Sequence, residues 1–137
     1  MPIQRYPHVL LVALAVLAMH VSLAAHHGAA AFDTGKDLTL TGAVTEWIWA
    51  NPHCFLKFDA MDDTGMVRNW AVETQNPTDM SRRGWRRMSF KVGDKVTVVL
   101  EAVKNGSPVG RVKTVTLPNG QILSASAPPT TVAEAGR

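Results

Sequence analysis

Hydrophobic and polar residues alternate differently in successive parts of this chain. Residues 9–25 form an apolar run, VLLVALAVLAMHVSLAA, which follows a basic residue, Arg5, and ends in small residues. Residues 26–37 show no apolar periodicity, and from residue 38 onwards β-branched and aromatic residues gather in short stretches separated by turn-forming residues. The first pattern is typical of a secretory signal peptide, and the last is typical of β-strands.

The apolar run therefore predicts export. We expect a signal peptide at 1–25, cleaved after Ala24 or Ala25, a flexible N-terminal arm at 26–37, a β-barrel domain at 38–125 and a disordered tail at 126–137. A single membrane anchor is the competing interpretation, because the run approaches the length that spans a bilayer. The expected location is the periplasm or the exterior of the cell, with membrane contact only through an uncleaved signal segment.

Alternating patterns predict the strands. The stretch 38–51 predicts a first strand, with a bulge or bend at Gly42, and Asn51-Pro52 ends it. Stretches 53–61 and 66–74 alternate on either side of a DDTG turn and predict an antiparallel hairpin. Further strands are expected within 92–103 and 109–117, joined by an Asn-Gly turn, and within 121–125.

A short helix interrupts the strands. Asn76 is a good N-cap and Pro77 suits the first helical position, so we expect a helix from Pro77 to about Arg83, ended by Gly84. The predicted fold is mainly β: a small five- to six-stranded antiparallel Greek-key barrel of the oligonucleotide/oligosaccharide-binding (OB-like) type, with one short helix. A β-sandwich fragment or an open meander capped by the helix would give nearly the same order of elements.

The composition of the chain argues against several classes of function. Of 14 basic residues one, Arg5, is lost with the signal peptide, which leaves 13 against 11 acidic residues and predicts no nucleic-acid partner. Because Cys54 is the single cysteine, an internal disulfide is excluded. The alternating pattern of residues 53–61 predicts that Cys54 lies in the core. No common catalytic signature is present, so we expect a binding protein that is not an enzyme. A thiol-dependent enzyme at Cys54 is a weaker alternative.

The histidines are the first candidates for a binding site, as ligands of a metal ion. Cleavage would leave His26 or Ala25 as the N-terminal residue, so that a free amine and the rings of His26 and His27 could chelate copper as Cu(II). His53 could supply a third ring nitrogen, with Glu73 orienting a ligand histidine. The alternatives are that the pair is merely solvated and that His53 hydrogen-bonds a carbonyl as a structural residue.

Tryptophans and arginines are the second candidates, as a surface that binds a ligand or a partner protein. Trp47 and Trp49 lie two residues apart and would share a strand face, and Trp85 follows the basic pair Arg82 and Arg83. If exposed, these residues could bind an unknown small ligand or a periplasmic protein without any metal. The alternative is that most of the tryptophan surface is core, because a small domain needs its aromatic residues for burial.

Several short motifs in a fixed order resemble a domain-of-unknown-function family of small exported bacterial proteins. They are His26-His27, TGAV at 41–44, NPH at 51–53, WAVE at 70–73, RRGW at 82–85 and Gly93-Asp94. Gly28 replaces the usual serine of the family's His-His-Ser start, and Cys54 is atypical. The resemblance covers roughly residues 26–123 and implies that the histidines belong to the family pattern, but it implies no catalytic residue.

Overall fold

The computed structural model describes residues 31–126. The predicted signal peptide, His26, His27 and residues 127–137 lie outside the described residues. The elements are β1 (Leu38–Ile48), β2 (Phe55–Met61), β3 (Val67–Glu73), α2 (Pro77–Arg82), β4 (Lys95–Ala102), β5 (Val109–Thr116) and β6 (Ile122–Ser124). Within 31–126, no helix is long and apolar enough to cross a membrane.

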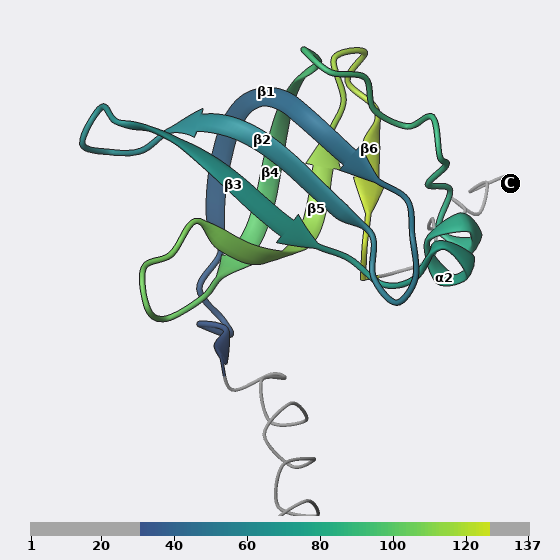
Figure 1. The fold of residues 1–137 in the computed structure, drawn as a ribbon, viewed down its shortest axis with the longest axis horizontal. Coiled ribbons are helices and arrows are strands. Elements are labelled where there is room, and N and C mark those ends of the chain that lie inside the picture. The colour runs from purple at the N-terminus through teal and green to yellow at the C-terminus, as the bar shows by residue number, and fades with distance from the viewer. Residues whose placement is uncertain (1–30, 127–137) are drawn as a thin grey trace, which may run out of the picture. The chain divides into compact units, whose positions relative to one another are not determined.

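Five strands close into a barrel. The sheet order is β3-β2-β1-β4-β5-β6, and a further pairing between β3 and β5 completes the circle, with β6 as an extra strand on β5 (Figure 1). That closing pair is parallel and joins Ala71–Glu73 to Val109–Arg111. The prediction of a mainly β barrel with one short helix is thus confirmed, whereas its wholly antiparallel character is wrong, because β3 and β5 meet as parallel neighbours. The alternatives of a sandwich fragment and an open meander are likewise excluded.

Strict alternation along β2 and β3 builds the core. On β2 the residues Leu56, Phe58 and Ala60 are buried, while Lys57 and Asp59 face outward. This follows from the two-residue period of a strand, which sends neighbouring side chains to opposite faces. The barrel interior is therefore filled by apolar side chains, and the polar chemistry lies on its outer face and at its ends.

Gly42 allows β1 to bend between two partners. It pairs with Ala60 of β2 and with Val96 of β4. A Cβ atom at this position would lie 2.1 Å from the carbonyl oxygen of Asp59, so no larger residue fits unless the backbone moves. The register irregularity of β1 lies slightly later, between Val44 and Glu46.

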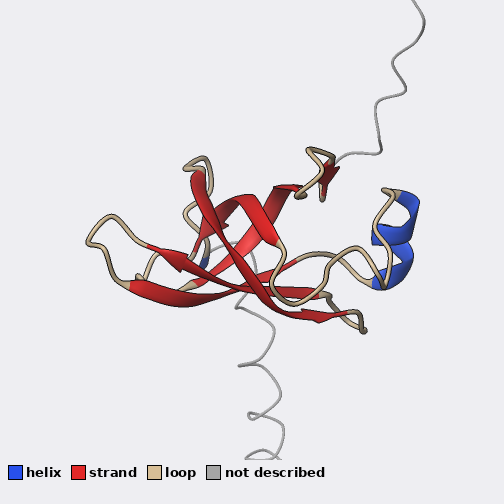
Figure 2. Cartoon of the chain, turned by 90° about the horizontal axis from the view of Figure 1, so that it is seen from above, coloured by secondary structure: helices blue, strands red, loops and turns tan. Residues whose placement is uncertain are grey.

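Helix α2 is capped as its sequence predicts. The Asn76 side chain accepts a hydrogen bond from the Asp79 amide at 3.0 Å, and Pro77 occupies the first turn. Gly84 follows with a φ of 88°, a conformation that favours glycine. In both views α2 lies beside one end of the strands, on the opposite side from the β2–β3 hairpin (Figures 1 and 2).

The described part of the segment before β1 contacts the barrel. Phe32 is buried and forms an isolated bridge with Val103, and the Asp33 amide donates to the Ala102 carbonyl at 2.8 Å. The Asp37 carboxylate accepts a hydrogen bond from Lys113 of β5 at 2.7 Å. These contacts bring residues 32–37 alongside β4 and β5.

Candidate functional site

His53 lies in the turn between β1 and β2, directly after a cis Asn51-Pro52 peptide bond. Its ring is half-buried, and Nδ1 lies 2.8 Å from the main-chain oxygen of Thr74. Since a carbonyl oxygen can only accept, Nδ1 carries the proton and donates it, so that in the neutral ring Nε2 has the free lone pair. His53 therefore has the structural hydrogen bond that the sequence offered as one alternative, and the same bond presents Nε2 as a possible ligand.

The surroundings of His53 are held by main-chain pairing. The Cys54 amide donates to the Gln75 carbonyl, and the Thr74 amide donates to the Cys54 carbonyl. No group of three or more histidine, cysteine or acidic residues suited to a metal occurs within residues 31–126. A site with three such ligands that includes His53 would thus draw at least one of them from outside that range.

The hydrogen bond that orients the His53 ring within the described residues comes from the Thr74 carbonyl and not from Glu73. The Glu73 side chain instead lines a polar groove.

Cys54 is fully buried, as the alternating pattern of residues 53–61 predicts. Burial raises the pKa of its thiol above the ordinary value, although hydrogen bonding to Ala50 and Thr74 acts in the opposite direction. A raised pKa and an inaccessible sulfur disfavour the thiolate on which nucleophilic attack depends.

Four aromatic rings form a continuous cluster at the end of the barrel that carries α2. Trp47 lies with ring centroids 5.7 Å from Trp49, 5.8 Å from Trp85 and 4.9 Å from Phe90. Trp85 is fully buried and its Nε1 donates to the Ser124 carbonyl at 2.8 Å, so its ring is part of the core and is not available as a ligand surface. Trp47 and Trp49 are half-buried and pack against the core, so only part of each side chain reaches the surface.

The two predicted surface arginines differ in environment. Arg82 is exposed and pairs with Asp79 across one turn of α2 at 3.4 Å. Arg83, the next residue, is half-buried and lines the groove that also contains Glu73. The structure thus brings together two residues, Glu73 and Arg83, that the sequence had assigned to different candidate sites.

This polar groove has a volume of about 350 Å³ and lies against the outer faces of β3, β4 and β5. Its charged lining consists of Glu73, Arg83, Glu101, Arg111 and Lys113. The last three had not been singled out in the sequence, although the alternation of β4 and β5 could have shown that they face outward. Side chains from well-separated strands converge here only because the barrel closes.

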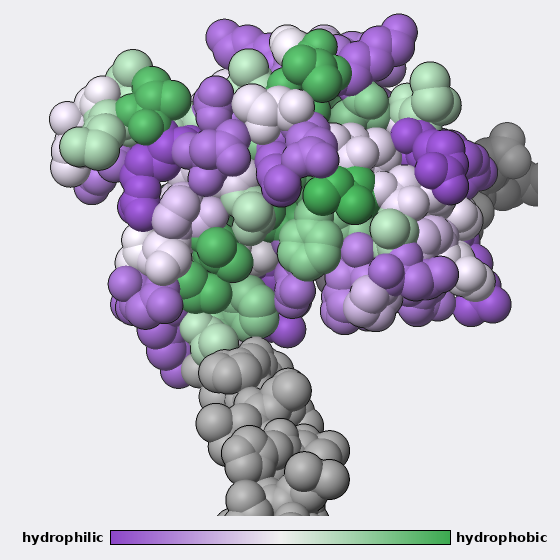
Figure 3. Space-filling view, viewed as in Figure 1, coloured by the Kyte–Doolittle hydropathy of each residue, from purple (hydrophilic) through white to green (hydrophobic). Residues whose placement is uncertain are grey.

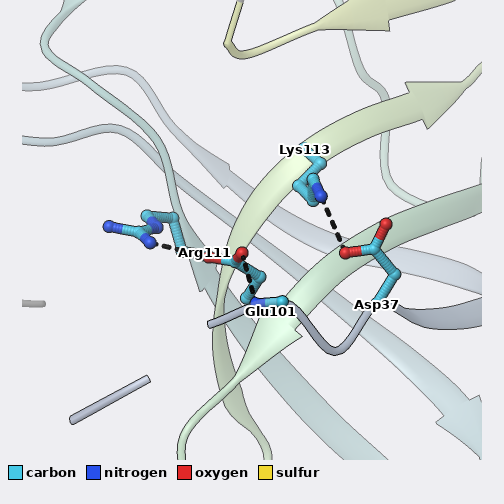
Figure 4. Close-up of polar contacts among 5 residues, drawn as sticks. Asp37, Glu101, Arg111 and Lys113 are labelled. Atoms are coloured by element: carbon cyan, nitrogen blue, oxygen red, sulfur yellow. Dashed lines mark hydrogen bonds and ion pairs between the residues drawn. The ribbon is translucent and has the colours of Figure 1, made fainter. Parts of the chain in front are cut away.

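Two ion pairs organise one side of the groove (Figure 4). Arg111 donates to the Glu101 carboxylate at 2.6 Å, and Lys113 donates to Asp37 at 2.7 Å. The Arg111 hydrogen bond, followed by the Gly35 amide, holds the pKa of Glu101 below its ordinary value. The Asp37 hydrogen bond raises the pKa of Lys113, so both pairs favour the charged state of the partners.

On the face of the molecule seen in Figure 3, hydrophobic areas lie among hydrophilic ones. Exposed apolar residues occur at the β2–β3 hairpin, where Met61, Met66 and Val67 are more than half exposed. A second pocket of about 560 Å³ lies next to this hairpin and includes Trp70, whose buried Nε1 has no hydrogen-bond partner within the described residues.

Comparison with known proteins assigns the chain to a family. A model for a family of unknown function, DUF6152, matches residues 13–112, which include all of β1 to β4 and His53. No curated protein and no solved structure matches the chain. The sequence motifs, the resemblance noted from them and this match agree, and the chain belongs to the DUF6152 family.

Proposed function

We propose that this protein is a small exported binding protein that holds Cu(II) through the histidines of its mature N-terminus, with His53 as a further ligand. The observation that carries the proposal is the orientation of the His53 ring. Its Nδ1–H bonds to the Thr74 carbonyl at 2.8 Å and leaves Nε2 as the ligand nitrogen. Histidines that bind metals usually donate their other ring N–H to a carbonyl or carboxylate in this way.

Strand pairing connects the strand that follows His53 to the segment before β1. Phe55, two residues after His53, pairs with Glu73, and Glu73 pairs with Arg111. The Arg111 guanidinium lies over the ring of Phe32, with 4.9 Å between its central carbon and the ring centroid. Arg111 thus lies two strand spacings, or roughly 10 Å across the sheet, from Phe55, and its side chain contacts Phe32.

The proposed ligands are the N-terminal amine, the imidazoles of His26 and His27, and His53 Nε2. A nitrogen-rich set of this kind favours Cu(II) among divalent ions. Metal binding would be accompanied by proton release, because the amine and the imidazoles bind only in their neutral forms.

The test uses protein exported and cleaved by its natural route, so that its N-terminus is His26 or Ala25. Titration with Cu(II) should give tight binding, and one additional glycine before the natural N-terminus should weaken it strongly while leaving every side chain in place. His53→Gln should reduce the number of nitrogens that couple to copper in the electron paramagnetic resonance spectrum. Micromolar or weaker binding that the extra glycine leaves unchanged would refute the proposal.

A second candidate is an OB-type module that binds an organic ligand without metal. The observation that favours it is the order of strands around the barrel, β1-β2-β3-β5-β4, with the helix between β3 and β4. Barrels of the OB type commonly bind oligonucleotides or oligosaccharides on their outer strands and loops. Trp85 is excluded from such a surface by burial, and Arg83 is retained because it lines the polar groove.

A further inference from the structure

The polar groove forms where β5 changes its partner. Strand β3 pairs with β5 only as far as Glu73 and Arg111, after which the chain turns away into α2. Strand β6 then pairs with β5 from Thr114 to Thr116. Between these two pairings the groove opens, bounded by the end of β3, the residue after α2 and the end of β6.

Some charged residues of the groove form ion pairs within the described residues, and others do not. Glu101 pairs with Arg111, and Lys113 pairs with Asp37 just outside the groove. Glu73 and Arg83 are both half-buried, and neither makes an ion pair or a side-chain hydrogen bond within the described residues. One carboxylate and one guanidinium thus face the same groove without a charged partner among residues 31–126, although partial burial makes an unpaired charge costly.

We propose that the groove binds a small zwitterionic molecule, an amino acid or a short peptide, with its carboxylate on Arg83 and its ammonium group on Glu73. The planar fork of arginine suits a carboxylate, which can accept two parallel hydrogen bonds from it. The volume of about 350 Å³ lies at the lower end of the range for small-molecule sites and suits a ligand of this size. The proposal does not depend on copper binding.

The test is a titration of the full mature chain with L-alanine and with dialanine, followed by the shifts of backbone amide resonances. The samples contain a chelator, because amino acids bind copper and would otherwise report on the metal site. Acetate and methylamine, which carry one charge each, are the comparison ligands. Binding of the zwitterions should shift amides around Glu73 and Arg83 and should be at least tenfold tighter than binding of either single-charge compound.

Substitutions then identify the charges that matter. Arg83→Gln and Glu73→Gln should each weaken binding about tenfold or more, because each removes a hydrogen bond between charged groups of the protein and the ligand. Arg82→Gln is the matched control, because Arg82 adjoins Arg83 in sequence but is exposed and pairs with Asp79. It should change the affinity less than twofold. If Arg83→Gln perturbs folding, Arg83→Lys keeps the charge without the fork and should bind several-fold more weakly than the native chain.

Three results would overturn the proposal. One is the absence of saturable binding of either zwitterion. The second is equal loss of affinity in Arg82→Gln and Arg83→Gln. The third is binding that appears only after removal of residues 127–137, which would assign the groove to the chain's own C-terminal segment.

Discussion

Replacement of Trp85 tests whether this ring stabilises the fold or serves as an exposed contact for a ligand. Its side chain is fully buried, lies 5.6 Å from Phe90 between ring centroids and donates from Nε1 to the Ser124 carbonyl. The amide of Trp85 also bonds to the Met80 carbonyl, so the residue connects the end of α2 to β6. We expect Trp85→Ala to lower the free energy of unfolding by about 3–5 kcal/mol, the usual cost of removing a large buried aromatic side chain.

Trp85→Phe provides a milder perturbation of the same site. A residual cavity of roughly 40 Å³, at about 24 cal/mol per Å³, accounts for about 1 kcal/mol. Loss of the indole hydrogen bond adds about another 1 kcal/mol. We therefore expect a loss of about 2 kcal/mol, which leaves the variant folded if the native stability lies in the usual range of about 5–15 kcal/mol.

Urea unfolding, followed by circular dichroism on the mature protein, measures both losses. Arg82→Ala is the control, because an exposed residue should change stability by less than about 0.5 kcal/mol. A Trp85→Ala variant that loses less than about 1 kcal/mol would show that the ring is not a core residue. The reasoning about the aromatic cluster would then be wrong.

Two further predictions concern acid stability and thiol reactivity. Arg111 and the Gly35 amide hold the pKa of Glu101 below its ordinary value, so this carboxylate stabilises the fold above its unfolded pKa of about 4.3, and that contribution is lost as the pH falls through the folded pKa. Unfolding free energies measured between neutral pH and pH 3 should therefore decline less steeply for Glu101→Gln, and identical slopes would contradict this role. Cys54 is fully buried and its pKa is raised, so a thiol reagent such as Ellman's reagent should label the native protein far more slowly than the urea-unfolded chain. Equal rates of labelling in the two states would show that the sulfur is accessible and would revive a role for the thiol.

The sequence by itself determined the local elements. The alternation that buries Leu56 and Phe58 and turns Lys57 outward depends only on neighbouring residues, and it correctly predicted the strand and the burial of Cys54. The cap and the first turn of α2 are likewise encoded within four residues, Asn76 to Asp79. Such features can be recognised in a sequence because the interactions that stabilise them join residues close together in the chain.

Only the tertiary structure decided how these elements meet. The parallel pairing of Ala71–Glu73 with Val109–Arg111 joins segments nearly 40 residues apart, and no local pattern distinguishes it from an antiparallel closure. That pairing creates the groove in which Glu73 and Arg83 face the same space. Trp85 follows two exposed or half-exposed arginines in the sequence, yet its ring lies in the core because the turn after α2 folds it against Phe90 and β6. Burial and proximity are properties of the closed barrel, since they depend on side chains contributed by distant strands.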